Sequence, residues 1–323
     1  MQTEMELAVW PSDFGLASLD VACLQSMVAA KIAAAPVKFR FSTRPGESPA
    51  GTLPLLIHGD TKLTNFEDIA EHLRNLKQEV VLDGELTPNQ RVEFFAYASY
   101  LRSRLYPALL HTLWVDNHNY NTVTHHWYTS KLYFPWNLFY LEKRRKFAQN
   151  YLKTVGKGEA ELIKEALQTL NLLSSKLGDN KYFCGDKPCS VDALIFGYLA
   201  PLLKLPLPSD RLYLHLSSLP NLSRFVESII CIYLPLPDEL IRQQNIEKQT
   251  WEKRKSKAQR TAEENRLRKE QKKSETEQSN ASSLRDTLLF GMGALTLSVL
   301  FAVHTGMISF IGEEDDKLDV GKN

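Results

Sequence analysis

Alternating apolar and polar positions mark the first 76 residues, and they predict a small α/β unit. The segments MELAVW and VKFRFS have the period of a half-buried strand, and the Ala-rich segment between them stops before Pro36, as a buried helix would. Two short strands joined by turn residues follow, and then a helix. In chain order, the predicted elements lie at residues 5–10, 18–35, 37–42, 52–57, 61–64 and 65–76.

The next part of the chain, residues 79–236, has helical periodicity throughout. Its first helix has the clearest start in the sequence. Thr87 occupies the N-cap position, Pro88 the first helical position and Gln90 the third, so that a capping box is combined with the residue preferred in the first turn. Two further helices are predicted at residues 159–177 and 190–203.

A charged segment at residues 237–285 separates this helical part from an apolar run. From Glu247 to Glu277 it contains eleven Lys or Arg and seven Glu, with almost no apolar stripe. The pattern is compatible with a disordered linker and with a solvated helix. Its cations are equally compatible with attraction to anionic head groups and with a solubilising spacer.

The apolar run extends from Thr287 to Gly312 without one Asp, Glu, Lys or Arg in 26 residues. About 20 helical residues cross a bilayer, and the Leu, Ile, Val and Phe content favours insertion by about 5 kcal/mol. Cations precede the run, and the acidic tail 313–323 follows it, which places the bulk of the chain in the cytosol. Residues 286–312 are therefore predicted to form a transmembrane anchor, with these side chains facing lipid: Leu288, Leu297, Leu300, Phe301 and Ile308.

Composition and charge exclude several other classes of protein. The 323 residues carry a net charge of +1, so there is no overall attraction to nucleic acid. The acidic amino terminus does not resemble a secretory signal or a mitochondrial presequence. The four cysteines are too few and too scattered for a disulfide framework, which predicts a reducing compartment.

The order of these elements resembles the glutathione transferases, an α+β architecture with a thioredoxin-like half (residues 1–78) and an all-helical half (residues 79–236). Leu53-Pro54 falls where that family keeps a cis-proline. The segment YFCGDKPCSVDALIFGYL resembles the family's F-x-G-D stretch before a capped core helix, although Cys189 stands where the family has Ser or Thr. The positions expected to be structurally important are Pro54, Thr87, Gly185, Asp186 and Asp192.

Transferase chemistry is not predicted, because neither glutathione-binding position is convincing. A transferase needs a Tyr, Ser or Cys after the first strand to hold a thiolate, and here Ser12 is followed by acidic Asp13. At the third helix, Phe66 stands where the resemblance implies Ser, and Glu67 and Asp68 would repel a carboxylate. We expect a protein without enzymatic activity and without a cofactor.

Two other clusters of side chains are candidates for a functional site. Four histidines lie close together at positions 111, 118, 125 and 126, but their spacing does not match a metal site. The aromatic residues between Leu113 and Tyr140 are too many for a polar loop, so part of this segment is expected to contact a partner. The candidates for this surface are Trp114, Tyr120, Trp127, Tyr128, Phe134 and Trp136.

A sharper resemblance comes from the same segment. LLHTLWVDNHNYNTVTHHWYTSKLYFPWN, with MELAVW, SPAGTLPLL and FCGDKPCSVDALIFGYLAPLL, is similar to the metaxins over about residues 5–235. The resemblance implies a cytosol-facing subunit of the mitochondrial outer membrane, with its short tail in the intermembrane space. It also implies work with a metaxin-2-like subunit and with the barrel insertase of the sorting and assembly machinery, which inserts β-barrel precursors.

The resemblance leaves the main role open. Metaxins are also linked to cristae-organising complexes and to motor adaptors, so a trafficking adaptor is an alternative to an import subunit. A membrane-tethered glutathione transferase is a further alternative. The family provides no residue-level functional motif to transfer to this chain.

Overall fold

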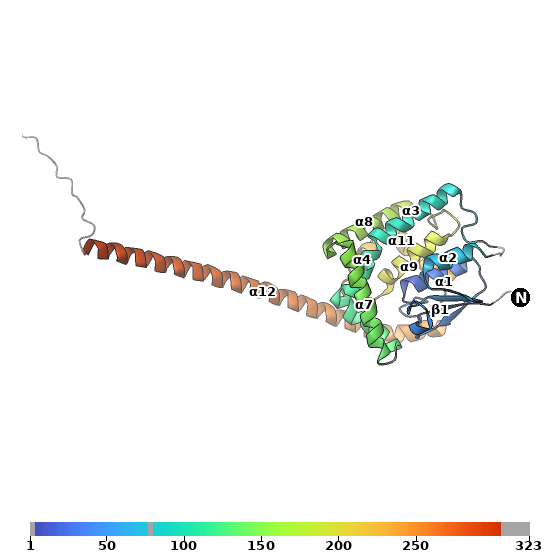
Figure 1. The fold of residues 1–323 in the computed structure, drawn as a ribbon, viewed down its shortest axis with the longest axis horizontal. Helices are drawn as coiled ribbons and strands as arrows, with labels where there is room; N and C mark the ends of the chain where they lie inside the picture. The colour runs from blue at the N-terminus through green and yellow to red at the C-terminus, as the bar shows by residue number, and fades with distance from the viewer. Residues whose placement is uncertain (1–3, 77–79, 305–323) are drawn as a thin grey trace, which may run out of the picture. The chain divides into compact units, whose positions relative to one another are not determined.

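The computed structural model describes residues 4–76 and 80–304, and for residues 273–287 and 302–304 it describes the backbone alone. The chain divides into two units, Met1–Arg260 and Thr261–Asn323 (Figure 1). Several expectations lie outside the described residues: the boundary at 78/79, Ile308 with the rest of the anchor from residue 305, and the tail 313–323.

A four-stranded sheet forms the first half of unit Met1–Arg260, in the order β2-β1-β3-β4. β1 runs parallel to β2 and antiparallel to β3, and β3 pairs antiparallel with β4. The central strand β1 is almost entirely buried, whereas the outer strand β2 is partly exposed, as expected from the alternation in its sequence. The bounds are β1 Met5–Val9, β2 Val37–Phe41, β3 Leu55–His58 and β4 Thr61–Leu63.

The helices of the first half begin where the sequence provides capping side chains. Asp20 accepts a hydrogen bond from the backbone N–H of Cys23 (3.1 Å) at the start of α1 (Val21–Ile32). Asn65 accepts one from the N–H of Asp68 (2.8 Å) at the start of α2 (Phe66–Arg74). A short 3₁₀ turn, η1 (Pro45–Glu47), precedes β3.

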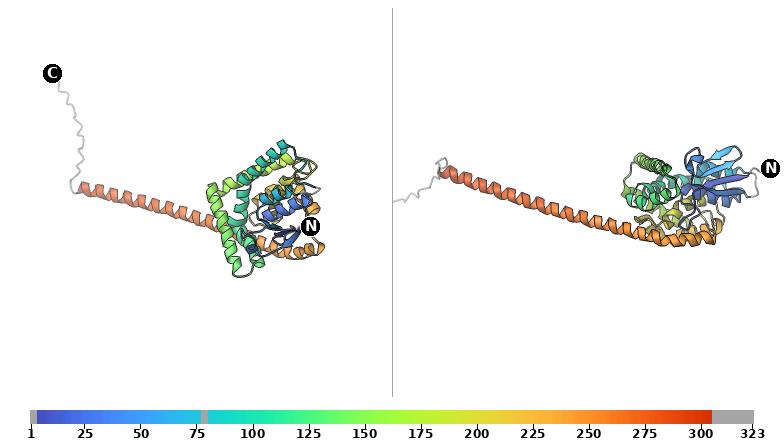
Figure 2. Two further views of the ribbon diagram at one scale, coloured as in Figure 1. Left: turned by 45° about the vertical axis from the view of Figure 1, so that its right-hand side comes forward. Right: turned by 90° about the horizontal axis from the view of Figure 1, so that it is seen from below.

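The second half is helical, and it lies beside the sheet (Figure 2). The Thr87 hydroxyl accepts from the Gln90 N–H (3.3 Å), and the Gln90 side chain accepts from the Thr87 N–H (3.0 Å), which confirms the predicted capping box. The helices are α3 Pro88–Arg104, α4 Tyr106–Leu110, α5 Asn117–Asn119, α6 His125–Lys131, α7 Trp136–Val155, α8 Glu159–Leu177, α9 Ser190–Lys204, α10 Arg211–Ser217 and α11 Pro220–Tyr233, with π-helical turns η2 His111–Val115 and η3 Tyr120–Thr124.

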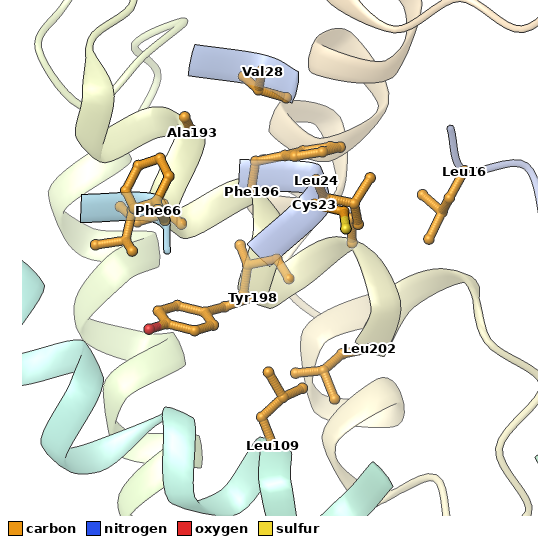
Figure 3. Close-up of a cluster of buried hydrophobic side chains, with 14 of the residues drawn as sticks. Leu16, Cys23, Leu24, Val28, Phe66, Leu109, Ala193, Phe196, Tyr198 and Leu202 are labelled. Carbon is orange, nitrogen blue, oxygen red and sulfur yellow. The ribbon is translucent and has the colours of Figure 1, made fainter. Parts of the chain in front are cut away.

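The two halves share one core, in which α1 packs directly on α9. The Gln25 side-chain amide donates to the backbone carbonyl of Leu194 (3.0 Å), and Gly197 lets the helices approach closely, because a Cβ there would lie 2.9 Å from the carbonyl oxygen of Val21. Figure 3 shows Phe66, from α2, in the same cluster as Phe196, from α9. The halves are therefore held together by apolar packing of the interior.

The start of α9 is organised by a buried carboxylate. Asp192 accepts hydrogen bonds from the backbone N–H groups of Phe183 (2.9 Å) and Cys189 (2.8 Å), and from the Cys189 thiol (3.0 Å). Gly185 has a φ of +98°, which favours glycine, whereas Asp186 is exposed. Burial raises the pKa of Asp192 to about 6, although the hydrogen bonds act to lower it.

Residues 237–285 were compatible with a disordered linker and with a solvated helix, and the structure has a helix there. α12 (Asp238–His304) is helical over its described length, and its residues up to Arg260 belong to the same unit as the sheet (Figure 2). Trp251 is buried, with its ring centroid 5.1 Å from that of Phe14 and 5.3 Å from that of His126. Trp251 thus helps to attach a segment whose overall composition suggested only solvent contact, together with Gln244, which accepts from the Gly15 N–H, and Lys255, which lies 3.4 Å from Asp210.

No helix in the described part of the chain is long and apolar enough to cross a membrane.

Candidate functional site

A cavity of about 320 Å³ lies between the sheet half and the helical half. One wall comes from the β1–α1 loop, from the loop before β3 and from the start of α2, and the other comes from α3, α4 and α7. The Leu53–Pro54 peptide bond beside it is cis, as the sequence predicted. Residues that line the cavity include Asp20, Leu53, Phe66, Arg102, Tyr106 and Arg144.

The loop after β1, where a transferase would hold its thiolate, is fixed by three contacts. The Asp13 carboxylate accepts a hydrogen bond from the Trp127 indole N–H (2.8 Å) in the interior. The N–H of Gly15 donates to the Gln244 side chain of α12 (2.7 Å), and Phe14 packs on Trp251. Ser12 does not line the cavity. This loop is therefore used for packing between the parts of the unit.

The start of α2, the expected position for a γ-glutamyl carboxylate, is also occupied by structural contacts. The Phe66 side chain is buried in the shared core, and Asn65 caps the helix. Glu67 forms an ion pair with Arg102 of α3. An incoming carboxylate would meet an apolar ring and a negative charge here, which supports the interpretation made from the sequence.

The structure separates the six aromatic residues expected at a partner surface into two groups. Four of them are core residues, which corrects that expectation: Trp114, Tyr120, Trp127 and Tyr128. Trp10 of the sheet half packs edge-on against two of these rings, with its centroid 6.1 Å from that of Trp127 and 5.0 Å from that of Tyr128. Trp127 and Tyr128 thus join the two halves of the unit, a contact that their spacing along the chain does not reveal.

Phe134 lies on the exposed turn between α6 and α7, and Trp136 is the first residue of α7. We call residues 133–139 the aromatic tip. Phe134 is 78% and Trp136 71% exposed, and three neighbours, Tyr133, Leu138 and Phe139, are more than half exposed. Exposed large apolar side chains this close together in the chain make the aromatic tip a candidate contact site.

The histidines do not form a metal centre. Within residues 4–76 and 80–304, no group of three His, Cys, Asp or Glu side chains could hold a metal ion. His125 and His126 instead contact aromatic rings, those of Tyr120 and Trp251 respectively. Burial lowers the pKa of His126, and nearby Arg254 adds to this effect.

The sequence did not indicate Arg144, which projects from α7 to the cavity. Its nearest carboxylate is Asp20, at 3.8 Å, and its guanidinium lies over the rings of Trp114 (5.3 Å) and Phe147 (6.0 Å). Burial acts to lower its pKa, but Tyr140 and Asp20 outweigh this and raise it, so the side chain is charged. The helical spacing Tyr140, Arg144, Ala148 was the available signal, because it places Arg144 on the buried stripe of α7.

The fold is that of a glutathione transferase. It is defined by the sheet order, the cis-proline loop, the helical half and the cavity between the two halves. Two solved structures share it, each with a TM-score of 0.51 and 14% identity. A beta-etherase from Sphingobium sp. strain SYK-6 matches over 75% of this chain and 100% of its own. A glutathione S-transferase from Ceriporiopsis subvermispora, in complex with glutathione, matches over 73% and 99%. At this identity the likeness concerns the fold alone.

Sequence comparison gives the family. Residues 23–145 match the family of the outer mitochondrial membrane transport complex protein Tom37, and residues 166–229 match the glutathione S-transferase C-terminal domain. The metaxin-1 homolog of Caenorhabditis briggsae is 49% identical over 318 residues, which cover 96% of this chain and 99% of that relative. Metaxin-1 of Mus musculus is 37% identical over 245 residues, 73% and 77% of the two chains. The chain belongs to the metaxin family.

Proposed function

We propose that this protein is a non-enzymatic subunit of the mitochondrial outer-membrane sorting and assembly machinery, which supports the insertion of β-barrel precursors. It would act as an interaction scaffold beside a metaxin-2-like subunit and the barrel insertase. The observation that carries the non-enzymatic part is the β1–α1 loop. The family's place in an outer-membrane transport complex supports the rest.

The absence of transferase activity has a direct test. Because Ser12 lies away from the cavity and Asp13 is bonded to Trp127, we expect the full chain to show neither retention on immobilised glutathione nor conjugation of a chromogenic electrophile. Glutathione-dependent turnover that is lost in Ser12→Ala would overturn this part of the proposal. It would favour a membrane-tethered transferase instead.

We further propose that residues 286–312 anchor the chain in the outer membrane, with the larger unit facing the cytosol and the tail in the intermembrane space. The support is the run of 26 uncharged residues, together with the exposure of large apolar side chains on α12. Leu288, Leu297, Leu300 and Phe301 are each more than 60% exposed, so water contacts them unless lipid or protein covers them.

The anchor is tested by Leu297→Arg. A central cation costs about 2.5–3.5 kcal/mol on insertion, so we expect the variant to shift to the cytosol with its larger unit still folded. Ser298→Ala is the matched control on the same helix, and it should remain in the membrane. Release of the unmodified protein by alkaline carbonate would contradict the anchor.

The aromatic tip is the proposed contact with a second subunit. Replacing Phe134 and Trp136 by Ser should reduce recovery of the metaxin-2-like subunit when the full chain is immunoprecipitated from detergent-solubilised mitochondria. Phe95→Ser provides a control, because Phe95 on α3 is 71% exposed and lies outside the tip. Equal recovery with both variants would remove the tip from the proposal, and recovery of motor adaptors in place of the insertase would favour a trafficking role.

A further inference from the structure

Arg144 has hydrogen-bonding capacity that the protein does not use. Its guanidinium carries five N–H donors in a fixed plane. Among the described residues it makes no hydrogen bond, and its Nε is buried without a partner. The Asp20 oxygen at 3.8 Å is too far away to accept one. Arg144 therefore presents a positive charge and unused N–H donors to the cavity.

The carboxylates of the cavity have their own partners. Asp20 is the N-cap of α1 and accepts from the Cys23 N–H, and burial raises its pKa, which weakens it as a counter-ion. Glu67 pairs with Arg102 near the start of α2. Arg144 therefore has a long ion pair with Asp20 (3.8 Å) and stacks on Trp114, and neither contact satisfies its N–H groups.

Apart from Arg102, which pairs with Glu67, and Thr124, the rest of this wall is apolar or aromatic. It includes the leucines at positions 109, 110 and 113 and the rings of Tyr106 and Tyr128. A volume of about 320 Å³ lies at the lower end of the range for small-molecule sites, which usually combine an apolar lining with a few polar groups that fix orientation. A ligand for this cavity would carry one acidic group and a compact apolar body.

We propose that the cavity binds a small organic monocarboxylate, with its carboxylate on the Arg144 guanidinium and its apolar part against the leucine and tyrosine side chains of α4, η2 and α6. A bidentate pair with two carboxylate oxygens is the geometry that a guanidinium favours. The carboxylate of the ligand would lie on the α7 wall, opposite the start of α2, where a transferase binds glutathione. The inference therefore does not depend on transferase activity or on membership of the import machinery.

Isothermal titration calorimetry of the full chain in a mild detergent tests this inference, with phenylbutyrate as the probe. Its neutral amide, phenylbutyramide, has the same shape without the charge, and we expect it to bind at least tenfold more weakly. Inorganic phosphate and glutathione are the competing ligands. If only phosphate binds, the cavity is a simple anion site. If glutathione binds more tightly than phenylbutyrate, the ligand position lies at α2. Either result overturns the proposal.

Matched variants separate a binding role from a structural one. Asp20→Asn keeps an N-cap and removes the competing carboxylate, so it should bind phenylbutyrate several-fold more tightly. Adding Arg144→Met to that variant leaves no unpaired buried charge and should weaken binding at least tenfold relative to Asp20→Asn. Lys146→Met, an exposed change on the same helix, should have no effect.

The outcomes are decisive even if the double variant does not fold. If Arg144 only stabilises Asp20, the Asp20→Asn variant will bind no better than the unmodified protein, and acid and amide will bind alike. Either result refutes the proposal, as does failure to detect binding at about 10 mM probe, a concentration that reveals even weak complexes.

Discussion

Replacing Asp192 by Ala should be among the most damaging single changes in the larger unit. The substitution leaves the backbone N–H groups of Phe183 and Cys189 buried without an acceptor. Each such group costs about 1–3 kcal/mol, which gives about 2–6 kcal/mol for the pair. Part of this is offset, because removal of a carboxylate whose pKa is raised to about 6 also removes a burial penalty, so we expect a loss of about 3 kcal/mol.

Thermal and urea unfolding of the full chain in a mild detergent would measure the loss. Asp192→Asn keeps one acceptor oxygen and should lose about half as much stability as Asp192→Ala. Asp186→Asn is the matched control, because Asp186 lies on the same segment but is exposed, and it should change stability by less than about 0.5 kcal/mol. If Asp192→Ala unfolds like the unmodified chain, or if Asp186→Asn is equally damaging, the role assigned to the buried carboxylate is wrong.

Three further predictions concern other contacts, and a fourth concerns the pH dependence of Asp192. Gly197→Ala should lower the melting temperature through a loss of about 1–3 kcal/mol, because the new Cβ would crowd the Val21 carbonyl; an unchanged melting temperature would contradict the tight contact between α1 and α9. Trp251→Ala should expose residues 238–260 to limited proteolysis, whereas equal resistance would mean that the ring does not hold this segment. Thr87→Ala should cost about 1 kcal/mol in urea unfolding, and no loss would argue against the capping box. The pKa of Asp192 is about 6 in the folded protein, above its ordinary value of 3.8, so its contribution to stability is complete below pH 3.8 and is lost as the pH rises through about 6. Lowering the pH from 7 to 5 should therefore raise the free energy of unfolding by about 1 kcal/mol relative to Asp192→Asn. Parallel stability–pH profiles of the two proteins would refute this.

Local sequence signals predicted the fold well. The capping box at Thr87 depends on residues within one helical turn, and the structure has it as predicted. The sheet and the cis bond before Pro54 also agree with the sequence. The docking of Trp251 was not predicted, because its partners Phe14 and His126 are distant in the chain and its own segment has almost no apolar stripe. Composition describes the average of a segment, whereas one ring can determine where it packs.

The candidate sites were harder to predict, because they depend on which side of a helix faces the interior. Trp127 and Trp136 are similar in type and close in sequence, yet one fills the junction between the two halves and the other is exposed. The resemblance to transferases located the cavity through Pro54 and Phe66, but it could not indicate Arg144, which belongs to the opposite wall. A half-buried arginine on a mostly exposed helix is visible in the sequence only as a polar residue on an apolar stripe.

The fixed loop after β1 limits what evolution or engineering could do with this scaffold. A tyrosine or cysteine placed at residue 12 would still stand beside Asp13, whose carboxylate the Trp127 indole holds in place, and the neighbouring Phe14 and Gly15 would still be tied to α12. A thiolate-binding site in this loop would therefore require simultaneous redesign of three separate chain regions, namely the loop itself, α6 and α12.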